Sequence, residues 1–286
     1  MKLYAFIDIE KSILAAWETA IGRLCSAVTS REGIGVSLFM FNRLRGLSNG
    51  RQNRTIQNEF ILEMVRQQYF SLQTSRLKGL YFFETIRDAT RAHEEWEFSC
   101  PPEYLCEINF DCVNFSKVDS QWITNFLSKK TDNSWMHKYW NGEALNDKPL
   151  YEIIAEGRGV IKNSKIKRVA YDFFLEKQPD TGPLLYISCC AFRCGYDDIS
   201  RVVPNIYLTG NNLNGRYLID MNMMNKLEKE ISNAIKDRRK FKDLKKPKLP
   251  KDENIFFRVP NMPTFEFEVE LNSTELADIA PHFSAA

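Results

Sequence analysis

Two carboxylates near the middle of the chain are the residues best placed for chemistry. Glu152 lies early in the segment PLYEIIAEGRGVI, directly after a polar stretch rich in aromatic residues. Glu156 follows four residues later and lies on the same face of an ideal strand. A carboxylate on a strand is held rigidly and can face a cleft, so Glu152 is the candidate catalytic group and Glu156 the second choice. A surface glutamate on an edge strand is the alternative interpretation.

An arginine and several aromatic rings form the second set of candidates. Ser75 and Arg76 lead into a short apolar run, Leu80–Phe83, that predicts a buried strand. Arginine can bind phosphate groups bidentately, which favours a binding role for Arg76. The alternative is that Ser75 only caps the start of the strand and that Arg76 is a solvated surface charge. Tyr139 and Trp140 lie in TDNSWMHKYWNGEALNDKP, which has the composition of a long loop, and such loops often carry function.

Several common enzymatic motifs are missing. The sequence contains no GxGxxG, no GxxxxGK[ST], no GxSxG and no HExxH. The sequence therefore gives no motif support for four classes of protein: Rossmann dinucleotide-binding proteins, P-loop NTPases, serine hydrolases of the GxSxG type and zincin metalloproteases.

Periodicity in the first half predicts alternating helices and strands. Apolar residues at steps of three and four predict helices. The predicted helices are Glu10–Ala27, Thr55–Tyr69, the segment IRDATRAHEEW and Asp119–Leu127. The predicted strands are GIGVSLFMFN, Leu80–Phe83, EYLCEINFDCVNF and PLYEIIAEGRGVI, with LRGLSNGRQNR as a loop.

The second half contains further short elements and a basic segment. We predict strands over LLYISCCAF, NIYLTGNN and TFEFEVEL, and a helix over Met221–Lys240. Residues 236–251 carry nine Lys and Arg against two Asp, a local net charge of +7, and Phe256, Phe257 and Arg258 follow. Interleaved cations and aromatic rings suit a nucleic-acid backbone, whereas a solvated linker is the alternative.

Composition limits the class of protein. The 286 residues are 44% hydrophobic, and the formal net charge is only +2, so any basic binding surface must be local. No run approaches the roughly 20 apolar residues of a membrane span, and charges at residues 8, 10 and 11 interrupt the start, which predicts a cytoplasmic protein. The seven cysteines lack a CxxC pair, and the three histidines are far apart, so we expect reduced thiols and no metal.

Six segments between residues 55 and 163 together resemble a known family. They are NEFILEMVRQQYF, TSRLKGLYFF, a helix ending in HEEW, EYLCEINF, KYWNG and PLYEIIAEGRGVI. In this order they resemble the ADP-ribosyltransferase-like proteins of bacteria and their phages. The last segment, with glutamate, three apolar residues, a spacer and glycine, is similar to the DNA-targeting ADP-ribosyltransferase toxins.

This resemblance implies a function and roles for individual residues. It implies an NAD-dependent mono-ADP-ribosyltransferase, with NAD as substrate and a nucleic acid or protein as acceptor, acting as a toxin, a phage-defence protein or a phage effector. Cleavage of the nicotinamide–ribose bond passes through an oxocarbenium-like state, which Glu152 would stabilise. Ser75 and Arg76 would hold the cofactor, and aromatic rings would stack on the nicotinamide. The candidates for stacking are Tyr81, Phe83, Tyr139 and Trp140.

One departure from the family concerns the first strand. That strand usually carries an Arg or His, whereas the N-terminus here offers Lys2, and Arg43, Arg45 or Arg54 could substitute. The departure favours a second hypothesis, a catalytically inactive transferase-like protein that holds nucleic acid or a protein through residues 236–251. A third hypothesis is an antitoxin or chaperone-bound partner whose C-terminal half does the binding. An inhibitory protein is a further expected partner.

The predicted fold class is α+β, because repeated βαβ units are absent. The resemblance adds a split β-sheet core with flanking helices and a smaller C-terminal α+β part. We therefore predict a catalytic domain over residues 1–163 and a region for target or partner recognition over 164–286.

Overall fold

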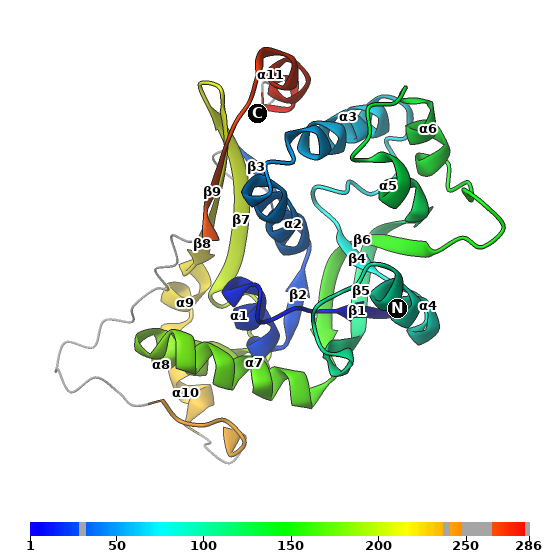
Figure 1. Cartoon of the computed structure of the whole chain (residues 1–286). Helices are drawn as coiled ribbons and strands as arrows, with labels where there is room; N and C mark the ends of the chain where they lie inside the picture. Colours follow the sequence, from blue (N-terminus) through cyan, green and yellow to red (C-terminus); the bar gives the residue numbers. More distant parts are fainter. Residues whose placement is uncertain (29–32, 237–240, 248–264, 284–286) are drawn as a thin grey trace.

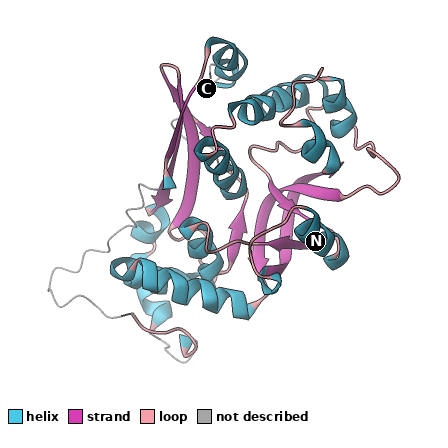
Figure 2. Ribbon diagram, in the orientation of Figure 1, coloured by secondary structure: helices cyan, strands magenta, loops and turns pink. Residues whose placement is uncertain are grey.

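Two antiparallel sheets and the helices around them make up the described part of the chain. The computed structural model describes residues 1–28, 33–236, 241–247 and 265–283 (Figure 1). Helices and strands are interspersed, and all strand pairs in the described residues are antiparallel (Figure 2). The predicted α+β class is confirmed.

The first sheet curls until two of its strands meet. β1 (Lys2–Phe6) pairs with β5 (Leu105–Asp119), and β5 pairs with β6 (Tyr151–Ile161). The other edge of β6 pairs with β4 (Leu80–Phe82) and with β2 (Arg23–Cys25). Tyr4 in β1 exchanges two backbone hydrogen bonds with Phe83, at 2.9 and 2.8 Å, directly after β4. The contact between β1 and the end of β4 brings the residues after β4 next to the N-terminal strand.

The second sheet combines a short N-terminal strand with three strands of the C-terminal half. Its order is β3 (Ile34–Gly35), β7 (Arg201–Thr209), β8 (Asn212–Asp220) and β9 (Phe267–Glu270). In β9, Phe267 and Val269 are buried while Glu268 and Glu270 are exposed, and the strand predicted over TFEFEVEL is confirmed for these residues.

Helices cover both sheets. In the first half they are α1 (Ile13–Ile21), α2 (Leu38–Asn49), α3 (Asn53–Tyr69), α4 (Ile86–Glu95), α5 (Gln121–Phe126) and α6 (Ser134–Trp140). In the second half they are α7 (Ser164–Lys177), α8 (Gly182–Arg193), α9 (Asn222–Lys226), α10 (Glu228–Ile235) and α11 (Ser273–Ile279). Helix α2 lies between the sheets and packs against β7 and β9 on one side and β4 on the other (Figure 1). None of the described helices has both the length and the apolar character needed to cross a membrane.

Most strongly periodic predictions are confirmed. The predicted helices over Thr55–Tyr69, IRDATRAHEEW and Asp119–Leu127 correspond to α3, α4 and α5. The strands predicted around Leu80–Phe83, EYLCEINFDCVNF, PLYEIIAEGRGVI and NIYLTGNN correspond to β4, β5, β6 and β7.

Five predictions were wrong in whole or in part. The two strand predictions failed because short apolar runs do not distinguish a buried strand from a buried helix. GIGVSLFMFN is a strand only at Ile34–Gly35, since Ser37 accepts a hydrogen bond from the Met40 N–H and begins α2. Helix α2 ends at Asn49 and so includes the first six residues of the predicted loop LRGLSNGRQNR. LLYISCCAF lies in α8 and is apolar because most of that helix is buried. The predicted loop around residues 131–149 contains α6. The helix predicted over Glu10–Ala27 ends at Gly22, whose φ of 100° stops it.

The helix predicted over Met221–Lys240 is two shorter helices, α9 and α10, in the described residues. Most of the basic segment 236–251, and Phe256, Phe257 and Arg258 with it, lies outside the described residues. All seven cysteines are described; they are free thiols, and Cys100, Cys106, Cys189 and Cys190 are buried.

Packing is continuous across the predicted boundary at residue 163. Arg23 is 2% exposed and pairs with Glu18, with Nη2 and Oε1 3.1 Å apart. The same guanidinium donates hydrogen bonds to the carbonyl oxygens of Asp197, Ile199 and Ser200 at 2.7 to 3.0 Å. Glu18 in turn accepts the Val202 N–H at 2.7 Å. The two halves share one hydrophobic core and this buried polar connection.

We expect Arg23→Met to destabilise the protein by about 3–5 kcal/mol, because it leaves Glu18 buried without its counter-charge. Urea denaturation followed by tryptophan fluorescence measures the change. Adding Glu18→Gln should recover part of the loss. The control is Lys177→Met, which removes an exposed pair with Glu176 and should cost about 1 kcal/mol or less. Equal losses in Arg23→Met and the control would contradict this account.

Candidate functional site

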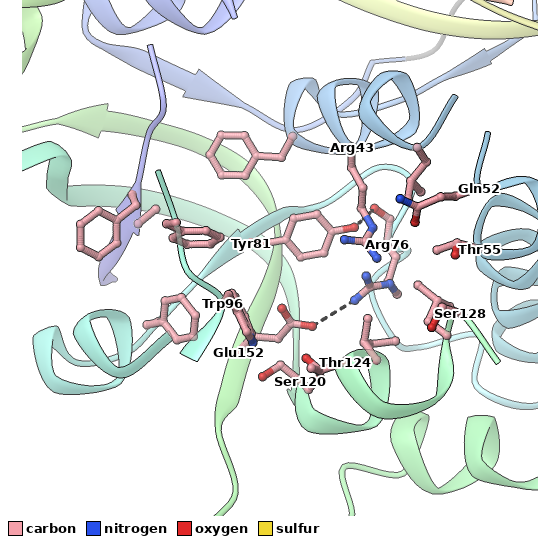
Figure 3. Close-up of a pocket in the computed structure, with 18 residues that line it drawn as sticks. Arg43, Gln52, Thr55, Arg76, Tyr81, Trp96, Ser120, Thr124, Ser128 and Glu152 are labelled. Carbon is pink, nitrogen blue, oxygen red and sulfur yellow. Dashed lines mark hydrogen bonds and ion pairs between the residues drawn. The ribbon is translucent and has the colours of Figure 1, made fainter. Parts of the chain in front are cut away.

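A cavity of about 560 Å³ opens between α2, α3, α5 and the β1–β4 contact. Figure 3 shows Arg43, Arg76, Tyr81 and Glu152 converging at its centre. One set of lining residues is aromatic and the other carries hydroxyl or amide groups. The aromatic residues are Phe6, Phe39, Tyr81, Phe83, Trp96 and Phe98. The polar residues are Gln52, Thr55, Ser120, Thr124 and Ser128. The volume is within the range of small-molecule sites.

Alternating charges link three elements at the cavity wall. Arg43 of α2 donates from Nε to Glu59 Oε1 of α3 at 2.9 Å. Arg76, just before β4, donates to both Glu59 oxygens at 2.9 and 3.1 Å. Arg76 also reaches Glu152 Oε1 of β6 at 3.0 Å. The sequence Arg43–Glu59–Arg76–Glu152 is neutral overall, and we call it the ionic chain.

Two tyrosines hold Arg76 in place. Tyr139 accepts a hydrogen bond from Arg76 Nη1 at 2.7 Å and donates one to Glu152 Oε1 at 3.2 Å. Tyr81 donates from its hydroxyl to the Arg76 carbonyl oxygen at 2.6 Å, and its ring centroid is 5.0 Å from the guanidinium carbon. Four of the five N–H donors of Arg76 therefore have partners within the protein.

Two groups in the ionic chain keep capacity for a ligand. Both hydrogen bonds of Glu152 use Oε1, and none of the described residues donates to Oε2, although Glu152 lines the cavity. The η nitrogens of Arg43 likewise make no hydrogen bond within the described part of the chain, and its side chain is 37% exposed. The cavity thus presents a carboxylate oxygen and guanidinium N–H groups that have no hydrogen-bond partner among the described residues.

The pKa values of the two buried carboxylates shift in opposite directions. Burial alone would raise the pKa of Glu59, but the attraction of Arg76 and Arg43 outweighs it, so this pKa falls below its usual value. Burial also raises the pKa of Glu152, and here the attraction of Arg76 only partly offsets it. The charge of Glu59 is well compensated, whereas that of Glu152 is compensated less completely.

The structure divides the predicted site residues into two groups. Glu152, Arg76, Tyr81 and Phe83 line the cavity, as the sequence interpretation requires. Ser75 does not line it: its side chain is buried and donates to Glu63 Oε2 at 3.0 Å, so its hydroxyl is committed within the protein.

The predicted positions of the α6 aromatic residues are also corrected. Tyr139 and Trp140 are both fully buried and lie outside the cavity lining, because their segment is a helix packed on α3. Trp140 donates from its indole nitrogen to the Leu62 carbonyl oxygen at 2.9 Å. Neither ring can stack on a ligand in the cavity. Glu156 is half-buried and does not line the cavity either.

Two charged residues of the site were not identified from the sequence. Arg43 was one of three arginines suggested as substitutes for the first-strand cation, and Glu59 was not among the candidates. Glu59 is 1% exposed, and the neighbouring Gln57 and Glu63 are also buried. No signal in the sequence points to their burial, because polar residues on a helix are ordinarily exposed to solvent.

Comparison with known proteins identifies one family model. The model for proteins of unknown function, DUF2441, matches residues 30–167, slightly less than half of the chain. All four residues of the ionic chain lie in this region. No curated protein matches the sequence.

The pKa of Glu59 predicts a pH-dependent contribution to stability. Because the folded-state pKa is lowered, Glu59 stabilises the fold above its unfolded pKa of about 4.3, and the contribution is lost as pH falls through the folded value. We expect Glu59→Gln to cost about 3–5 kcal/mol at neutral pH and less in acid.

Urea denaturation at several pH values measures this difference. The matched control is Glu176→Gln, which removes an exposed carboxylate and should change stability little at any pH. A loss for Glu59→Gln that is constant from neutral to acidic pH would contradict the assigned pKa direction.

Proposed function

We propose that this chain is an NAD-dependent mono-ADP-ribosyltransferase whose reaction takes place in the cavity at Glu152. The observation that carries the proposal is the unpartnered Oε2 of Glu152, held on a strand between aromatic and hydroxyl-bearing walls. Such a site suits a substrate with a planar ring joined to a sugar. The resemblance of residues 55–163 to ADP-ribosyltransferase-like proteins supports the same assignment.

In the proposed reaction the bond between ribose C1′ and the nicotinamide nitrogen breaks. Its electron pair moves to the nicotinamide ring and neutralises the positive charge there. The ribose carbon gains oxocarbenium character, and the ionised Glu152 stabilises that charge and accepts hydrogen bonds from the ribose hydroxyls. A nucleophilic oxygen or nitrogen of the acceptor then bonds to C1′ and loses its proton.

The structure suggests different tasks for the two arginines. We assign phosphate binding to Arg43, because its η nitrogens are free, rather than to Arg76, to which the sequence interpretation gave this role. Arg76 becomes a positioning residue that holds Glu152 and is itself held by Glu59. An arginine at the cavity also supplies the cation that was missing from the first strand.

The aromatic wall provides the nicotinamide site in this proposal. Tyr81 and Phe83 are on the same face of the β4 segment and both line the cavity. Their rings offer flat surfaces for stacking on the nicotinamide. The acceptor is a nucleic acid or a protein that must reach the ribose carbon through the open side of the cavity. A role as a toxin or in phage defence follows from the family resemblance alone.

We expect Glu152→Gln to reduce NAD turnover by at least about 100-fold, because the amide cannot stabilise a cation. Nicotinamide release by purified protein, with cell lysate or total nucleic acid as acceptor, measures the rate. Glu156→Gln, on the same strand but outside the cavity, should retain activity. Thermal unfolding of each variant shows that it is folded. Absence of turnover by folded wild-type protein in every mixture would leave the non-enzymatic binding hypothesis.

We expect Arg43→Ala to raise KM for NAD by roughly 10- to 100-fold with a smaller effect on kcat, because one charge-assisted contact to phosphate contributes about 1.5–3 kcal/mol. Steady-state kinetics over a range of NAD concentrations measures both constants. Arg54→Ala is the matched control, since Arg54 is exposed on α3 and outside the cavity. An unchanged KM in Arg43→Ala would contradict the phosphate-binding role.

A further inference from the structure

A second cleft, of about 950 Å³, lies between α7, the end of α8 and residues 241–247. Figure 1 places α7 and α8 at the opposite end of the molecule from α3, α5 and α6. This cleft is therefore separate from the cavity at Glu152. The sequence interpretation assigned no element to residues 164–177, so the α7 wall of the cleft was not anticipated.

The 241–247 side of the cleft is fixed in place by several contacts. Arg193 of α8 donates to both carboxylate oxygens of Asp243 at 2.6 and 2.7 Å. Tyr171 of α7 donates from its hydroxyl to the Lys245 carbonyl oxygen at 2.8 Å. Phe241 is buried, and Pro247 packs against Gly182 at the start of α8. This part of the basic segment is consequently a structured wall rather than a solvated linker.

Cations line both sides of the cleft. Lys167 and Arg168 project from α7, and Lys242 and Lys245 belong to the opposite wall. Five cations and three carboxylates line the cleft. The cations are Lys167, Arg168, Arg193, Lys242 and Lys245, and the carboxylates are Asp172, Glu176 and Asp243. Asp243 is already paired with Arg193, so it offers little compensation to the others.

Lys167 is a half-buried cation of the α7 wall. Its side chain passes over Gly22, where a Cβ atom would be 3.0 Å from Lys167 Cδ, so the glycine allows this close approach. No carboxylate of the described residues is within ion-pairing distance of its ammonium group. Burial, together with Arg193 and Lys162, lowers the pKa of Lys167. A half-buried cation among like charges is stabilised by an anion from outside the protein.

We propose that this cleft binds the phosphate backbone of a nucleic acid. The cations form two rows across an open cleft rather than a closed pocket around one phosphate, which suits a chain of regularly spaced anions. The inference does not depend on the proposed NAD chemistry. If the transferase assignment also holds, the cleft would retain nucleic acid on the enzyme without contributing to the reaction.

Binding of a fluorescent single-stranded DNA of about 20 nucleotides tests the proposal, with anisotropy measured between about 50 and 200 mM salt. The test variant combines Lys167→Gln, Arg168→Gln and Lys242→Gln. We expect its affinity at low salt to fall about tenfold or more, and the slope of log affinity against log salt to decrease by about 2, since each released counterion contributes about 0.7 for single strands.

The control variant combines Lys2→Gln, Lys117→Gln and Lys129→Gln, which remove the same charge outside the cleft. It should bind almost as tightly as the wild type, and thermal unfolding checks that both variants are folded. Equal weakening in the two variants would mean non-specific attraction and overturn the proposal. Competition by inorganic phosphate as effective as competition by unlabelled DNA would indicate a single-phosphate site and also overturn it. No NAD is present, so the outcome is independent of the transferase assignment.

Discussion

Burial of the Arg76 guanidinium is the constraint on which the candidate site depends. A charge that is only 4% exposed must be compensated within the protein, and Glu59 and Glu152 supply that compensation from α3 and β6. Because Glu59 also pairs with Arg43, the same requirement fixes α2 relative to α3. Helices α2 and α3 and the distant strand β6 are thereby held around one cavity. Rigid first contacts of this kind are what a catalytic carboxylate needs.

The fold places this ionic chain at a cavity because the first sheet curls. The Tyr4–Phe83 contact brings β1 to the end of β4, so rings from both strands face the space beside Glu152. On the other side, α2 is supported by the second sheet, whose strands come mostly from the C-terminal half. The buried Arg23–Glu18 pair joins that half to α1. The C-terminal half therefore supports the helix that carries Arg43, even though none of its described residues lines the cavity.

The sequence predicted the elements in which hydrophobic periodicity was clear. Long periodic helices such as α3 and alternating strands such as β5 were predicted, and Glu152 with Arg76 could be selected because each leads a strand. It was not informative where burial removed periodicity: α8 is apolar nearly all round, and α2 begins at a single capping serine, Ser37. Glu59 could not be identified because a carboxylate on a helix is ordinarily solvated, and only the fold shows two arginines facing it.

The charges exposed by the ionic chain complement those of NAD, the proposed substrate. The ionic chain is neutral as a whole, but its two unsatisfied ends differ in sign: a carboxylate oxygen of Glu152 and the η nitrogens of Arg43. NAD divides its charge in the same way, with a cationic nicotinamide ring and an anionic pyrophosphate. Bond cleavage removes the ring's positive charge and places it on the ribose, so a fixed carboxylate at that position stabilises the transition state more than the bound substrate. Arg76 contributes by preventing Glu152 from turning away, which is why its own donors are used within the protein.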